Sequence, residues 1–159
     1  MMNPPYYWLW MLGIGAAGLG LFYLFWRTRK QDTAWPVTRS MAIFEKRRPS
    51  LQAAFFQAAS QSGKPRGLRW TDCQWSDAIE WVRDRRTGQL LALVGVAISF
   101  AAIEGGDMEG VEAVSNLRNA SAVFFFHDGD WHTAGHVIFN LNPDEAVEHF
   151  KGGYERVSF

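Results

Sequence analysis

Hydrophobic residues form one unbroken run near the start of the chain and recur with periods of two or 3.6 positions further on. Residues 6–26 hold no charged side chain. At ~1.5 Å rise per residue, a helix of this length is about 30 Å long, which matches the hydrocarbon core of a bilayer. Aromatic residues gather at both ends of the run, as in the interfacial belts of membrane helices. The pattern predicts a short tail, residues 1–5, and one transmembrane helix over residues 6–26.

Charges on either side of this run predict its orientation. Residues 1–5 carry none, whereas residues 27–48 carry seven basic and two acidic side chains. By the positive-inside rule, the N-terminus faces outward and the C-terminal domain faces the cytoplasm. We interpret residues 27–49 as a basic juxtamembrane linker, which an anionic leaflet of the lipid bilayer would attract.

Small residues form a stripe within the predicted span. Residues 13–18 match the spacing G-x-G-x-x-G. This spacing binds dinucleotides only on a turn between a strand and a helix, which a position inside the membrane excludes. Gly13 with Ala17, and Ala16 with Gly20, lie one helical turn apart and would let a second helix approach closely. We therefore expect association through this stripe.

After Pro49, the period of 3.6 positions predicts a helix over residues 50–62. Ser50 is a suitable N-cap, and Gly63 and Pro65 predict where the helix ends. Its expected buried stripe is Leu51, Ala54, Phe55 and Ala58.

From residue 67 onward the hydrophobic residues no longer follow the helical period of 3.6, and their pattern favours the strands of a sheet. The expected strands are residues 67–75, 79–84, 90–103, 111–127 and 131–139. Asp128 and Gly129 between two apolar runs predict a type I′ hairpin. A short helix follows, with Asn142 as its N-cap and Pro143 in its first turn, and residues 154–159 form a tail.

These elements predict an α+β domain over residues 50–153: an antiparallel sheet of about five strands, packed by an early helix and a short C-terminal helix. In the order of its elements the chain resembles the cystatin-like and nuclear-transport-factor-like proteins, which implies a curved sheet around the early helix. The resemblance rests on element order alone, so it implies no activity and no site residue.

Two strands are apolar on both faces, in residues 90–103 and 124–126. The early helix can cover one face. The second face needs the linker, the tail, or the surface of another protein or a second copy.

Composition narrows the class of function. The chain has 16 basic and 16 acidic residues, so no global basic excess favours nucleic acid as a partner. Hydrophobic residues make up 48%, which excludes disorder of the whole chain. The single cysteine, Cys73, excludes an intramolecular disulfide.

Candidate chemistry is sparse. His132 and His136 have a helical metal-ligand spacing, but they lie on a predicted strand, where this spacing separates them by about 13 Å. Cys73 would be the only candidate nucleophile, and no catalytic motif surrounds it. The acidic residues of the loop over 104–110 lack the register of a calcium site, and we interpret Asp107 and Glu109 as an exposed contact loop. No catalytic residue, cofactor or metal site is assigned.

The sequence therefore predicts a single-pass membrane protein that is not an enzyme. Its cytoplasmic domain would act as an accessory or scaffold by binding another protein or a second copy, through the membrane helix and the second face of the sheet. The alternative is a small-ligand binder or an enzyme that uses a pocket between the curved sheet and helix 50–62. Four tryptophans are candidates to line such a pocket: Trp70, Trp75, Trp81 and Trp131.

Overall fold

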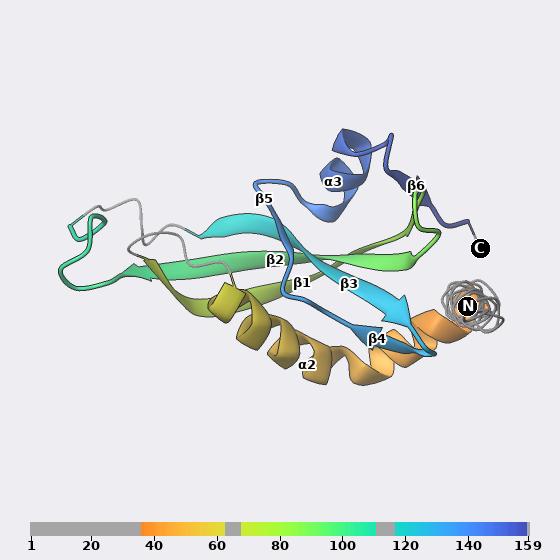
Figure 1. Ribbon diagram of the computed structural model, residues 1–159, viewed down its shortest axis with the longest axis horizontal. Coiled ribbons are helices and arrows are strands. Elements are labelled where there is room, and N and C mark those ends of the chain that lie inside the picture. The colour runs from red at the N-terminus through yellow and green to blue at the C-terminus, as the bar shows by residue number, and fades with distance from the viewer. Residues whose placement is uncertain (1–35, 63–67, 111–116, 159) are drawn as a thin grey trace, which may run out of the picture.

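The computed structural model describes residues 36–62, 68–110 and 117–158, which form an α+β domain with two helices and six antiparallel strands (Figure 1). In chain order the elements are α2 Val37–Ser62, β1 Leu68–Asp84, β2 Leu90–Ala102, β3 Arg118–His127, β4 Asp130–His132, β5 Val137–Phe139, α3 Pro143–His149 and β6 Tyr154–Arg156. The sheet order is β4-β3-β2-β1-β6, and β5 also pairs with β3. The expected fold class of this domain is confirmed, with one strand more than predicted.

The predicted membrane span, residues 6–26, lies outside the described residues, as do Gly13, Ala16, Ala17 and Gly20. Within the described ranges, no helix is both long enough and apolar enough to cross a bilayer.

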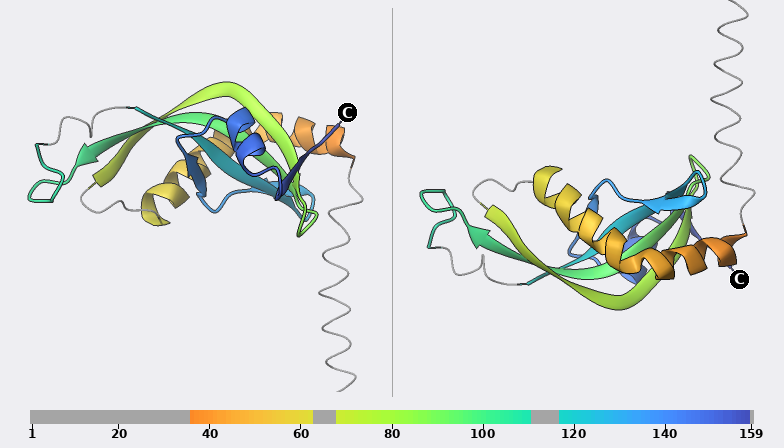
Figure 2. Two further views of the ribbon diagram at one scale, coloured as in Figure 1. Left: turned by 90° about the horizontal axis from the view of Figure 1, so that it is seen from above. Right: turned by 90° about the horizontal axis from the view of Figure 1, so that it is seen from below.

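The sheet is strongly curved, and the two helices lie on opposite faces of it (Figure 2). β1 is one long strand where two were expected, because bulges keep it paired with β2. One bulge lies between Trp70 and Asp72, and the other between Trp75 and Ile79. Bulges of this kind bend a strand and increase its twist.

Helix α2 begins at Val37, so the prediction that residues 37–49 belong to a linker is wrong. Ser40 and Phe44 are buried and continue the stripe of Leu51 and Phe55 toward the N-terminus. Pro49 lies inside the helix, where it lacks an N–H to donate. Figure 2 shows that the two halves of α2 follow different directions, which fits a proline bend.

Two further details of the predicted helix 50–62 are wrong. Ser50 lies inside α2, and its hydroxyl donates a hydrogen bond back to the Arg47 carbonyl at 2.8 Å, so it is not the N-cap. Ala54 is exposed, and the buried stripe continues through Ala59.

The face of the sheet toward α2 holds the main core, which is rich in aromatic residues. Phe44 of α2 packs edge-on against Trp81, Phe124 and Trp131, with ring centroids 5.2–5.4 Å apart. The buried indole of Trp131 donates a hydrogen bond to the Ser40 carbonyl at 2.6 Å. This bond fixes α2 to the β3–β4 hairpin, because it satisfies a polar group that would be costly to bury alone.

The opposite face has a smaller core beneath α3. Ala146 and Val147 of α3 pack with Val82, Leu91 and Leu93, all of them buried. The predicted cap of α3 is confirmed as a capping box: the Asn142 side chain accepts from the Glu145 N–H, and the Glu145 carboxylate accepts from the Asn142 N–H.

The end of the chain also helps to cover this side of the sheet. Residues 154–156 were expected in a tail, but they form β6, which pairs with the end of β1. Tyr154 packs against the smaller core. The apolar part of the second face is therefore covered from within the chain, by α3 and β6.

Candidate functional site

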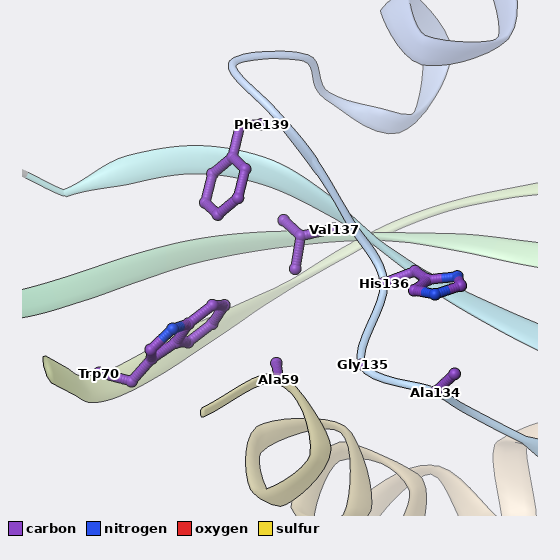
Figure 3. A pocket seen from close by; sticks show the side chains of 7 residues that line it. All are labelled: Ala59, Trp70, Ala134, Gly135, His136, Val137 and Phe139. Carbon is purple, nitrogen blue, oxygen red and sulfur yellow. The ribbon is translucent and has the colours of Figure 1, made fainter. Parts of the chain in front are cut away.

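A cleft opens where the C-terminal end of α2, the start of β1 and β5 meet, on the α2 side of the sheet. Its volume is about 320 Å³. Its lining residues are Ala59, Trp70, Ala134, Gly135, His136, Val137 and Phe139. Figure 3 shows Trp70, Val137 and Phe139 pointing into one space above Ala59. Clefts of this size with aromatic walls are typical sites for a small molecule or for one side chain of a partner.

The cleft depends on an interruption in the predicted strand 131–139. The structure divides this strand into β4 and β5, and the segment between them packs against the last turns of α2. Gly135 has a φ of +74° and lies against the backbone of Ala58 and Ala59. Thr133 stabilises this segment, because its hydroxyl donates to the Val123 carbonyl and accepts from the Gly135 N–H.

Aromatic rings form the walls of the cleft. Trp70 is 6% exposed, and its ring centroid lies 5.3 Å from that of Phe100 and 6.4 Å from that of Phe139. Phe139 is 43% exposed, similar to Ile103, Leu117 and Phe150 elsewhere in the described domain. The cleft therefore has a rigid wall at Trp70 and an accessible one at Phe139.

Among the described residues that line the cleft there is no Asp, Glu, Lys or Arg. The only ionisable residue in its lining is His136, whose imidazole points away from Trp70 and Phe139 (Figure 3). The aromatic and aliphatic side chains of this lining are suited to binding an apolar group.

The other three candidate tryptophans lie away from the cleft. Trp81 and Trp131 pack on each other at 5.5 Å between ring centroids, within the main core. Trp75 packs on Phe55 at 5.3 Å. Only Trp70 of the four lines this cleft.

The predicted contact loop follows β2 at the end of the domain far from the start of α2 (Figure 1). Asp107 and Glu109 are both exposed. The Glu109 carboxylate turns back and accepts a hydrogen bond from the Gly105 N–H at 2.8 Å. Glu109 therefore stabilises the loop conformation, and Asp107 remains available to solvent.

The histidines and aspartates near the β3–β4 hairpin do not gather at one point: His127 lies 3.3 Å from the Asp128 carboxylate, and His132 and Asp130 have other neighbours. The turn has positive φ angles at Asp128 (+51°) and Gly129 (+81°), as predicted for a type I′ turn. His132 stacks on Phe125, and Asp130 pairs with Arg47 of α2. In the part of the chain that the structure describes, no three His, Cys, Asp or Glu side chains converge to hold a metal ion.

Cys73 lies half-buried on β1 and packs against the main core. Burial, with a smaller contribution from the Asp72 carboxylate, raises the pKa of its thiol from 9.0 to about 12. A thiol that stays protonated at neutral pH is a poor nucleophile, so its setting is that of a structural cysteine.

A second groove, of about 300 Å³, lies beside the large β1 bulge. Its lining combines apolar residues such as Trp75 and Val96 with the polar side chains of Gln74, Ser76, Asn119 and Asn142, and no charged residue is among the described lining. Ser76 leaves no space for a side chain at Gly95, because an added Cβ would be 2.2 Å from the Ser76 hydroxyl oxygen. The groove has a mostly apolar lining, as the cleft does, but Trp75 is its one aromatic wall, whereas Trp70 and Phe139 both line the cleft.

Two features of the cleft were not predicted from the sequence: the role of Phe139 and the packing of Gly135 on α2. The signal for both was Gly135 itself, since an isolated glycine within a strand pattern often marks a break or a close backbone approach. Comparisons of this chain with protein families, with curated proteins and with solved structures give no significant match. The cleft is therefore assigned from its geometry alone.

Proposed function

We propose that this chain is a single-pass membrane protein that acts by binding, and that its binding site is the cleft between α2 and β5. The domain would face the cytoplasm and serve as an accessory subunit that holds an apolar group close to the bilayer. The membrane part of this proposal rests on the charge-free run over residues 6–26 and on the basic residues that follow it.

The observation that carries the proposal is the aromatic lining of an open, uncharged cleft. Trp70 and Phe139 present ring faces and edges to the same space, and Phe139 is 43% exposed there. An apolar or aromatic group that entered would remove both rings from water, with a gain of roughly 25 cal/mol per Å² of apolar surface buried. The group could belong to a small molecule or to a side chain of another protein.

The second face of the sheet is a weaker candidate for binding. Its apolar part around Leu91 and Leu93 already packs under α3. Further along β2 the same face carries Gly95 and the small residues Ala97 and Ser99, which offer little apolar surface. This distribution favours the cleft on the opposite face as the place where a partner contributes apolar groups.

The proposal is tested by photocrosslinking from the cleft in intact cells. Phe139 is replaced by p-benzoylphenylalanine, which keeps an aromatic ring in the wall. The matched control carries the same residue at Phe150, which is 42% exposed but lies outside the cleft. We expect an adduct from position 139 only, and we expect Trp70→Ala to abolish it.

Mass spectrometry then separates the two sources of the apolar group. A small mass increase on the chain indicates a bound small molecule, and a protein-sized increase indicates a polypeptide. Adducts of equal yield from positions 139 and 150, or no adduct from position 139, would overturn the proposed binding site.

The orientation is tested separately with reporters fused after Phe159. We expect activity from a reporter that works only in the cytoplasm and none from one that requires export. The reverse pattern would contradict the cytoplasmic assignment without changing the argument for the cleft.

A further inference from the structure

Strand β5 is an edge strand beside the cleft, with one side paired to β3. Ala120 lies opposite Phe139, Ser121 opposite Ile138, and Ala122 opposite Val137. On the other side of β5, no strand pairs with it among the described residues. A free edge of this kind presents backbone donors and acceptors to any strand that reaches it.

The hydrogen bonds at both ends of β5 identify which backbone groups are free. The Val123 N–H donates to the His136 carbonyl at 3.0 Å, and the Asn140 N–H donates to the Asn119 carbonyl at 2.8 Å. Hydrogen-bonded residues alternate along an antiparallel pair, so Ile138 also directs its N–H and C=O toward β3. Val137 and Phe139 must direct theirs outward, and no hydrogen bond from these groups to another described residue is present.

This arrangement is symmetric about Ile138. A second copy of β5, placed antiparallel with Ile138 opposite Ile138, brings Val137 of each copy opposite Phe139 of the other. All four outward N–H groups then meet four outward carbonyls, because residues 137 and 139 form hydrogen-bonded pairs. The edge is therefore complementary to itself, which is the requirement for a two-fold interface.

The side chains match this register as well. Val137 and Phe139 line the cleft on the same side of the sheet. In the two-fold pair, Phe139 of each copy lies beside Val137 of the other, so the exposed part of its ring gains an apolar neighbour. The two clefts then adjoin across the interface.

We propose that two copies of this chain pair through β5, with Ile138 on the two-fold axis, and that Phe139 of each copy completes the wall of the other copy's cleft. This deepens the proposed function, since it rests on the cleft as the binding site and makes the dimer the binding unit. β5 has three residues, so the pairing is weak between free molecules. Confinement of both copies to one membrane raises their effective concentration and favours it.

Disulfide trapping tests the register in the full-length chain, in native membranes, with Cys73→Ala as the background. Residues directly opposite each other in a non-hydrogen-bonded pair have Cα atoms ~4.5 Å apart, within disulfide range. Ile138→Cys should therefore form a covalent dimer upon mild oxidation.

Val137→Cys is the matched control, one residue away on the same strand. In the proposed register two copies of residue 137 are offset by two positions, ~8 Å apart, which is too far for a disulfide. Membranes that contain Val137→Cys in one tagged copy and Phe139→Cys in another should instead give the mixed dimer. This second arm does not depend on any change at Ile138.

The register is overturned if Ile138→Cys stays monomeric, or if positions 137 and 138 crosslink to themselves at equal rates. A dimer that forms through the membrane segment alone would leave Ile138→Cys without a disulfide between the two copies. In the photocrosslinking test an adduct that adds the mass of one further chain, 18.1 kDa, reports the dimer, and any other adduct reports the bound group, so failure of the trapping and failure of the proposed function give different results.

Discussion

Gly135 touches the backbone of Ala59 so closely that an added Cβ at position 135 would lie 2.4 Å from the Ala59 nitrogen. This contact joins the segment between β4 and β5 to the last turns of α2, and it sets the floor of the cleft. Any side chain at position 135 would push the two elements apart.

Gly135→Ala should therefore destabilise the domain strongly. The new Cβ would collide with the backbone of α2. In addition, a residue with a Cβ at a φ of +74° costs ~1–2 kcal/mol. We expect a loss of about 3 kcal/mol or more in the free energy of unfolding, measured by chemical denaturation of the purified full-length protein. Gly88→Ala is the control, since Gly88 has a φ of +75° and nothing within 4 Å of an added Cβ. An equal loss in both variants would contradict the close packing.

Acid should weaken the link between α2 and the β3–β4 hairpin. Partial burial acts to raise the pKa of Asp130, but hydrogen bonds from the Arg47 guanidinium and the Trp131 N–H outweigh it and lower the pKa below 3.8. A carboxyl group with a lowered pKa stabilises the fold fully above pH 3.8, and this contribution is lost as the pH falls through the lowered pKa.

The pH test compares melting temperatures between pH 7 and pH 2. The melting temperature of the native chain should exceed that of Asp130→Asn by a constant amount above pH 5, and this difference should shrink below pH 4. Asp107→Asn is the control, because the Asp107 carboxylate makes no ion pair among the described residues. A difference that stays constant down to pH 2 would exclude Asp130 as a source of acid sensitivity.

The capping box of α3 should contribute measurably to covering the second face. Asn142→Ala removes the side chain that accepts from the Glu145 N–H, and loss of such a cap costs about 1 kcal/mol. Glu145→Gln keeps both hydrogen bonds of the box and should cost much less. Denaturant titration of the two variants makes the comparison, and equal losses of stability would show that the charge of Glu145 contributes as much as the Asn142 cap.

Cys73 should react slowly with alkylating reagents. A thiol pKa of about 12 in place of 9.0 lowers the thiolate fraction at pH 8 by about a thousandfold. Rates with iodoacetamide should rise steadily with pH up to about 11, and Asp72→Asn should raise the rate because the Asp72 carboxylate contributes to the shift. A rate at pH 8 equal to that of the unfolded chain would contradict the buried setting.

The fold class and the local turn chemistry were predictable, because they depend on neighbouring residues. The hairpin at Asp128 and the cap at Asn142 are examples, since each motif contains all the atoms that stabilise it. The start of α2 was not predictable in the same way. Pro49 next to Ser50 favours a helix start, and only the tertiary burial of Ser40 and Phe44 shows that the helix continues through the proline.

The cleft was the hardest feature to predict, because its walls come from three separate segments. Trp70 was a candidate on composition alone, but Phe139 was part of an ordinary strand pattern. The packing of Gly135 on α2 breaks this strand, and that contact joins residues 76 positions apart in the sequence. No local pattern encodes a contact of this kind.

In the proposed single-pass arrangement, the early start of α2 would limit how far the domain can move from the membrane. With a linker over residues 27–49, the domain could reach about 80 Å from a span that ends at residue 26. Because α2 begins at Val37, only ten residues would separate it from the proposed span, and ten residues extend to at most about 35 Å. The domain would then stay within that distance of the bilayer surface, and only partners equally close to the bilayer could bind in the cleft.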